Sequence, residues 1–84
     1  MGSNELLRAL GAAVRALRLA RGLTQERLAE EAGLHTMYVS DVERGRRNVG
    51  VINIDRLATA LSVDLPTLMG DVERQRHGRP TADS

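Results

Sequence analysis

The fold is decided by residues 24–44, which read TQERLAEEAGLHTMYVSDVER. Thr24 can cap a helix that begins at the next residue, and Gly33 can adopt the left-handed conformation that ends it. Ala29 is the small residue needed where two helices cross, and the turn glycine follows it by four residues. The first part of this stretch therefore predicts a short helix, about residues 25–32, followed by a tight turn.

A second helix is expected after the turn, from about Thr36 to Arg44. Leu34 fills the corner between the two helices, while Val39 and Val42 supply the apolar anchors of the second one. Together these positions form the pattern of a helix-turn-helix. In that motif the second helix enters the major groove of duplex DNA.

The rest of the chain predicts three further helices and no strand. In residues 4–21, apolar side chains recur every three or four positions, which indicates one amphipathic helix. Residues 45–50 form a polar, arginine-rich loop, residues 51–61 a fourth helix, and Asp64 caps a short fifth helix. We therefore expect an all-α domain of five helices within residues 1–70.

Residues 71–84, DVERQRHGRPTADS, contain almost no apolar side chains. A chain segment that cannot bury apolar surface does not offset the entropy of ordering it. We expect a polar, frayed C-terminal tail with room for one more helical turn.

Composition excludes several kinds of site. Cysteine is absent, and the two histidines, His35 and His77, match no metal-ligand spacing. No apolar run has the length of a membrane span and no signal-peptide pattern opens the chain, so we expect a soluble cytoplasmic protein. We find no catalytic site and expect neither metal nor cofactor. The net charge of +1 argues against a nonspecific nucleic-acid coat, but Arg44, Arg46 and Arg47 form a local basic patch.

Three segments resemble the lambda-repressor-like (XRE) helix-turn-helix family. They are residues 22–33, GLTQERLAEEAG, residues 38–45, YVSDVERG, and residues 54–63, IDRLATALSV. The resemblance covers roughly residues 10–69 and implies a lambda-repressor-like domain with its helix-turn-helix at about 24–44.

A narrower resemblance concerns single-domain size and residues 38–48, YVSDVERGRRN. Both are similar to the controller proteins of restriction-modification systems. The family resemblance implies a sequence-specific transcriptional regulator that binds a palindromic operator in double-stranded DNA as a homodimer. Such a regulator occupies its operator and either blocks RNA polymerase or touches it directly.

One face of the second motif helix is not needed by the core. At about 100° per residue, five side chains share this face: Thr36, Met37, Ser40, Asp41 and Arg44. In a recognition helix they would reach base edges, with Met37 packing on a thymine methyl and the hydroxyls bonding to several bases. Asp41 would either accept from cytosine or orient Arg44. The alternative is an ordinary solvated helix face.

Phosphate contacts are expected on both sides of this face, because backbone contacts fix the register of a protein on DNA. Gln25 stands at a helix N-terminus that favours anions, and it resembles the family's phosphate-clamping glutamine. Arg46, Arg47 and Asn48 lie in the loop after the recognition helix and can grip the other backbone, unless they are simply a solvated run. The Tyr38 hydroxyl can reach a phosphate, or the ring covers the edge of the core.

The family resemblance also implies a buried ion pair between Arg18 and Glu43, which would set the tilt of the recognition helix. His35 departs from the family, which prefers Ser, Thr or Asp at this cap position. Histidine caps less well, and a DNA contact is the other interpretation of this residue.

Dimerisation is expected at the C-terminal helix. Four apolar side chains exceed what one short helix can bury beneath itself: Val63, Leu65, Leu68 and Met69. The family resemblance places the dimer contact in this region. The alternative is that these side chains close the core of the monomer.

A second function class stays open. An antitoxin-type protein-interaction module would neutralise a toxin through its tail or C-terminal helices and also regulate its own operon. The tail is short and polar for that role. This alternative would also leave the arginine-rich loop and the free helix face without a use.

Overall fold

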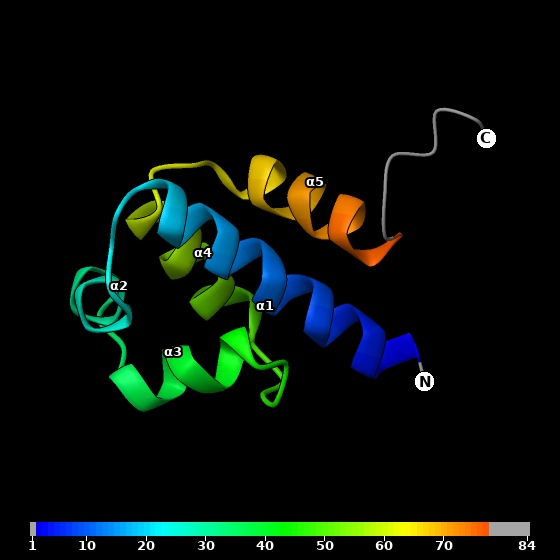
Figure 1. Cartoon of the computed structure of the whole chain (residues 1–84), viewed down its shortest axis with the longest axis horizontal. Helices are drawn as coiled ribbons and strands as arrows, with labels where there is room; N and C mark the ends of the chain where they lie inside the picture. The colour runs from blue at the N-terminus through cyan, green and yellow to red at the C-terminus, as the bar shows by residue number, and fades with distance from the viewer. Residues whose placement is uncertain (1, 78–84) are drawn as a thin grey trace.

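The computed structural model describes residues 2–77, and all the regular secondary structure in this range is helical. The five helices are α1 (Gly2–Ala20), α2 (Gln25–Ala32), α3 (Thr36–Glu43), α4 (Val51–Ala60) and α5 (Leu65–Arg76). The predicted all-α class and the five predicted helices are therefore confirmed. Figure 1 shows α1 running between α5 and α3, with α4 behind it. No helix in the described part of the chain is both long and apolar enough to cross a bilayer.

The predicted turn of the motif is present. The Thr24 hydroxyl accepts a hydrogen bond from the Arg27 backbone N–H at 3.0 Å and so caps α2. Gly33 ends α2 with φ +72°, in the left-handed region where only glycine is free of strain. The next residue, Leu34, donates its backbone N–H to the Ala29 carbonyl at 2.8 Å. These bonds cap both ends of α2 and lead the chain into α3.

The core is aliphatic and receives side chains from every helix. Its fully buried larger side chains are Leu28, Leu57, Leu61, Leu68, Val14, Val39, Val42 and Val72. The predicted anchors of α3, Val39 and Val42, are among them. The predicted stripe on α1 is buried in its middle but not at its start, because Leu6 remains 36% exposed.

Gly11 is a residue that the sequence analysis did not single out. A Cβ atom at this position would lie 2.4 Å from the carbonyl oxygen of Val42 and 2.6 Å from that of Glu43. Real Cβ atoms do not approach oxygen atoms so closely. The backbones of α1 and the C-terminal turn of α3 therefore touch directly, and this contact fixes where α3 lies.

The fifth helix is longer than predicted. It continues past Gly70 to Arg76, and Val72 is fully buried. The extra helical turn for which the sequence left room is present over residues 71–76, so the expectation of a frayed chain fails for this part of the tail. The physical reason is that Val72 follows Leu68 by four residues, so both fully buried side chains lie on one face of α5. Figure 1 shows that α5 runs alongside α1. The rest of the predicted tail, residues 78–84, lies outside the described residues.

Leu68 also needs a correction. It was predicted in the dimer interface, but it is fully buried within the single chain, so it cannot contact a partner. For this residue the alternative holds, and it closes the core of the monomer. Val63, Leu65 and Met69 are only partly buried.

Candidate nucleic-acid interface

The outer face of α3 is available to a ligand. Thr36, Met37 and Arg44 are exposed, and Ser40 and Asp41 are half-buried. Met37 is 70% exposed, although its side chain is large and apolar. The five residues predicted to read bases therefore share one accessible surface on the side of α3 opposite its buried valines.

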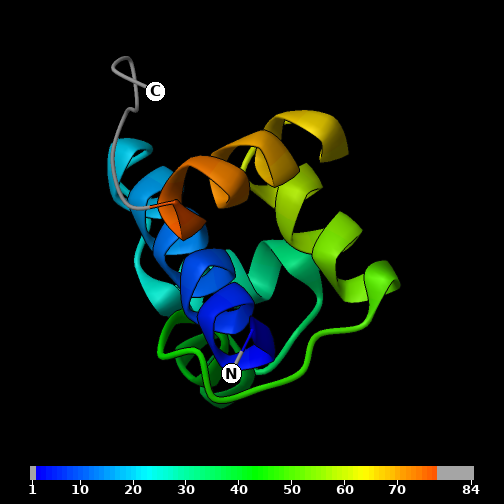
Figure 2. The same cartoon turned by 90° about the vertical axis from the view of Figure 1, so that its right-hand side faces the viewer.

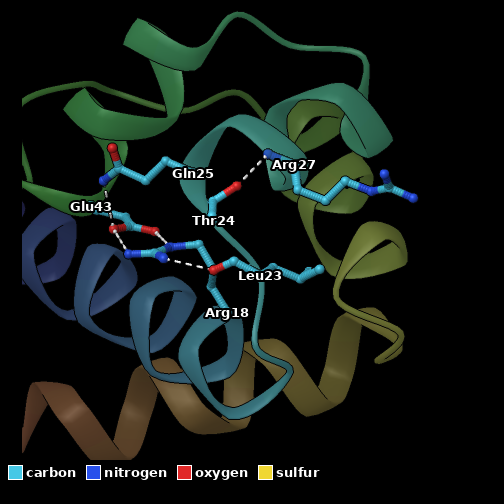
Figure 3. Close-up of polar contacts among 6 residues, drawn as sticks. All are labelled: Arg18, Leu23, Thr24, Gln25, Arg27 and Glu43. Atoms are coloured by element: carbon cyan, nitrogen blue, oxygen red, sulfur yellow. Dashed lines mark hydrogen bonds and ion pairs between the residues drawn. The ribbon is translucent and has the colours of Figure 1, made fainter.

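The C-terminal end of α3 is held by the ion pair that the family resemblance implied. Arg18 Nε lies 2.6 Å from Glu43 Oε2, and Arg18 Nη2 lies 3.0 Å from Glu43 Oε1 (Figure 3). The two side chains are only 9% and 3% exposed. The hydrogen bond with Glu43 raises the pKa of Arg18 further. Arg18 also donates to the Leu23 carbonyl at 2.8 Å, so one guanidinium ties α1 to the chain entering α2 and to α3.

Gln25 belongs to the same cluster. Its side-chain Nε2 donates to Glu43 Oε1 at 3.0 Å (Figure 3), an interaction that the sequence analysis did not predict. The Glu43 carboxylate therefore accepts from two side chains on two other helices. An amide nitrogen carries two hydrogens, so Gln25 keeps one donor for a further partner.

A second cluster joins α3, the loop after it and α4. The Arg47 guanidinium lies 4.8 Å from the centre of the Tyr38 ring, and Arg47 Nη2 lies 3.3 Å from Asp41 Oδ2. The Tyr38 hydroxyl accepts a hydrogen bond from Asn53 Nδ2 at 3.1 Å. Asp41 therefore pairs with Arg47, and the suggestion that it orients Arg44 is wrong. Asn53 was not predicted, because no local pattern reveals that it faces a residue on another helix.

The loop between α3 and α4, residues 45–50, is fixed at both ends. Gly45 has φ +71°, and a Cβ there would lie 2.9 Å from Cγ of Arg8, so a larger residue would be strained and would force Arg8 to shift. At the other end the Val49 side chain is buried in the core. Three polar side chains remain exposed between these anchors: Arg46, Arg47 and Asn48. The loop thus presents its cations beside the outer face of α3.

Comparison with known proteins agrees with this geometry. A helix-turn-helix family model matches residues 14–68. The control protein C.BamHI of Bacillus amyloliquefaciens is 41% identical over 68 residues, which cover 80% of this chain and 84% of the relative. The restriction-modification controller protein C.AhdI from Aeromonas hydrophila has a TM-score of 0.72 at 50% identity, over 74% of this chain and 94% of that one.

A further solved structure contains DNA. The restriction-modification controller protein C.Esp1396I, as a tetramer in complex with its natural 35-base-pair operator, has a TM-score of 0.80 and 26% identity. The match covers 86% of this chain and 95% of that one. The chain therefore belongs to the helix-turn-helix family of DNA-binding transcriptional regulators, and its similarity to C.BamHI and C.AhdI places it among the restriction-modification controller proteins.

Proposed function

We propose that the protein is a homodimeric regulator that binds a palindromic operator and controls transcription of a restriction-modification operon. The observation that carries this proposal is the outer face of α3, which is polar, accessible and flanked by the cationic loop. C.Esp1396I, a relative of the same fold, binds a natural operator as a tetramer. Acting in the cytoplasm, the bound protein would exclude RNA polymerase from the promoter or contact it directly.

Sequence would be read by α3 in the major groove. The Thr36 and Ser40 hydroxyls can donate to or accept from several bases, and Met37 can pack on a thymine methyl. Arg44, at the C-terminal end of α3, can bond to guanine. Asp41 can accept from cytosine with the oxygen that Arg47 does not occupy. Because α3 would make the base contacts, we expect substitutions on α3 to change which duplex sequences the protein prefers.

Phosphates would be held on both sides of the groove. Arg46 and Asn48 are exposed on the loop, and Gln25 keeps one free donor at the start of α2. The Tyr38 hydroxyl accepts from Asn53, so its own proton remains free to donate to a phosphate oxygen. These contacts carry no sequence information, and they fix the register of α3 on the duplex.

The dimer contact would use the partly exposed apolar side chains around the start of α5, which are Val63, Leu65 and Met69. Val51 and Ile52, at the end of α4 remote from the start of α5, are each 66% exposed and offer a second apolar surface. In Figure 2, α4 and the start of α5 lie along the same side of the molecule. Contacts along this side would leave α3 free in both copies.

Leu65→Asp is expected to shift the protein towards monomer, with dimerisation weakened by about tenfold or more, because a buried leucine contributes about 1.5 kcal/mol or more. An acidic residue in the first turn of α5 is favourable for the helix itself, so the fold should persist. Sedimentation velocity measures the shift. Leu6→Asp, a matched change near the N-terminus of α1, should leave the dimer intact. An unchanged dimer for Leu65→Asp would place the interface elsewhere.

The function is tested by selection from random duplexes of about 30 base pairs, which can hold two half-sites about one helical turn apart. We expect enrichment of a palindrome. Selection with Met37→Ala should return a motif altered at one position in each half-site, whereas Thr59→Ala, an exposed change on α4, should return the same motif. If the protein retained duplexes but no motif were enriched among them, the proposal would be contradicted, and a protein partner would be indicated instead.

A further inference from the structure

We propose that Asn53 of α4 is a positioning residue for operator reading: it holds Tyr38, and through the Tyr38 ring it keeps Arg47 beside Asp41. This inference rests on the proposed function, because it assumes that Asp41 and Arg47 meet DNA. It adds a residue of α4 to an interface otherwise built from α2, α3 and the loop.

The four side chains form a continuous chain of contacts. Asn53 Nδ2 donates to the Tyr38 hydroxyl at 3.1 Å, the ring of Tyr38 lies 4.8 Å from the Arg47 guanidinium carbon, and Arg47 Nη2 lies 3.3 Å from Asp41 Oδ2. The chain starts on α4, passes through α3 and the loop, and ends on the outer face of α3. The position of Arg47 in the loop therefore depends on Asn53, which does not itself reach the outer face of α3.

Asn53 has no competing task in α4. The cap of this helix is Gly50, and no side chain contributes a capping hydrogen bond there. Asparagine is among the less favourable residues inside a helix, so its presence at the third position of α4 calls for a tertiary contact. Within residues 2–77 the side chain of Asn53 forms one hydrogen bond, to Tyr38, and Asn53 is half-buried.

The contacts from Asn53 to Tyr38 and from Tyr38 to Arg47 act as a tether for Arg47. Arg47 needs this tether because its side chain is long and its backbone lies in a loop. A free arginine loses rotamer freedom when it binds, and that loss weakens the complex. The stacked and paired Arg47 has already lost this freedom, yet its side chain is still 46% exposed and can meet DNA. The tether also keeps a cation next to the Asp41 carboxylate, which would otherwise be repelled by nearby phosphates.

Removal of the tether is tested with Asn53→Ala, Tyr38→Phe and the double variant. Tyr38→Phe deletes the hydroxyl that Asn53 holds and keeps the ring under Arg47. For each variant the ratio of affinities for the selected operator and for a scrambled duplex is measured at one salt concentration. Each single change should lower this ratio by about 3- to 10-fold, the range expected for one hydrogen bond. The double variant should lose no more than either single one.

Thr59→Ala is the matched control, since it removes an exposed polar side chain from the same helix. It should leave the ratio unchanged. Losses that multiply in the double variant would show that Asn53 and Tyr38 act independently, which overturns the proposal. An unchanged ratio in Asn53→Ala would overturn it as well. Asn53→Asp should restore the ratio, because its carboxylate accepts a hydrogen bond from the Tyr38 hydroxyl instead. The hydroxyl proton is then no longer free for a phosphate, so this variant should bind both duplexes more weakly.

A second measurement needs no DNA and so separates this inference from the proposed function. Tyr38 is the only tyrosine, and the chain has no tryptophan or phenylalanine, so tyrosine fluorescence reports on this ring alone. Asn53→Ala should lower the fluorescence anisotropy of the folded protein, because the ring gains freedom, whereas Thr59→Ala should not. An unchanged anisotropy would refute the tether. A lowered anisotropy together with no operator for the parent chain would instead refute the proposed function.

Discussion

Replacing Glu43 with alanine is expected to lower the free energy of unfolding by about 3–5 kcal/mol, because the change leaves a buried guanidinium without its carboxylate. Arg18 is held in a site where its side chain is only 9% exposed, and the Leu23 carbonyl alone cannot replace a charged partner. Gln25 loses its acceptor in the same step. Urea unfolding followed by circular dichroism measures the loss. For a domain of this size each kcal/mol corresponds to about 4–8 °C in Tm.

The chain contains a matched control for this prediction. Arg27 and Glu31 form an ion pair of similar length, 2.8 Å, but on the surface of α2, with 60% and 34% of their side chains exposed. Glu31→Ala should cost only about 0.5 kcal/mol or less. A Glu43→Ala loss as small as that of Glu31→Ala would contradict the structural role of the buried pair. The double change Arg18→Met with Glu43→Met should recover much of the stability, since it leaves no unpaired charge.

The helices and the motif could be predicted from local pattern. Helix periodicity depends on neighbours three and four residues away, and caps such as Thr24 act within one turn, so one sequence contains the whole signal. The same holds for the turn at Gly33. Arg18 and Glu43 are 25 positions apart, and nothing local links them. Their pairing came only from resemblance to the family.

Two features that were not predicted, the close contact at Gly11 and the burial of Val72, do have signals in the sequence. Gly11 stands inside a helical pattern, where glycine costs about 1 kcal/mol relative to alanine, and a residue that weakens its own helix often allows a close contact. Val72 continues the spacing of Leu68 by four residues, although the surrounding charges of the tail hide it. The low count of apolar residues favoured a frayed tail, whereas the single apolar residue of 71–76, Val72, is fully buried and α5 continues to Arg76.

The side-chain partners of the candidate site could not be predicted. Asp41, Arg44 and Arg47 are all close in sequence, and charge alone permits either arginine to pair with the carboxylate. The choice depends on where the loop turns at Gly45 and on the Tyr38 ring over which Arg47 lies. Both features involve distant parts of the chain, because Gly45 packs against Arg8 of α1 and the Tyr38 hydroxyl bonds to Asn53 of α4.

Operator affinity is expected to fall by about 10³–10⁵-fold between roughly 50 and 200 mM salt, if the dimer contacts about 6–10 phosphates. The two loop arginines should contribute differently to this slope. Arg46 has no ion-pair partner among residues 2–77, so its charge is fully available to displace a counterion from DNA. Arg47 forms an ion pair with Asp41, so part of its positive charge is already neutralised before the protein binds DNA.

Fluorescence titrations of labelled operator at several salt concentrations measure the slope for each variant. Arg46→Ala should reduce it by about one per protomer, and Arg47→Ala should reduce it by less while also lowering preference for the operator. Asp41→Asn should raise the slope, because it frees the Arg47 charge. A slope close to zero in the parent chain would show that the loop does not meet phosphates. Equal effects of Arg46→Ala and Arg47→Ala on both slope and preference would mean that the pairing of Arg47 with Asp41 has no part in binding.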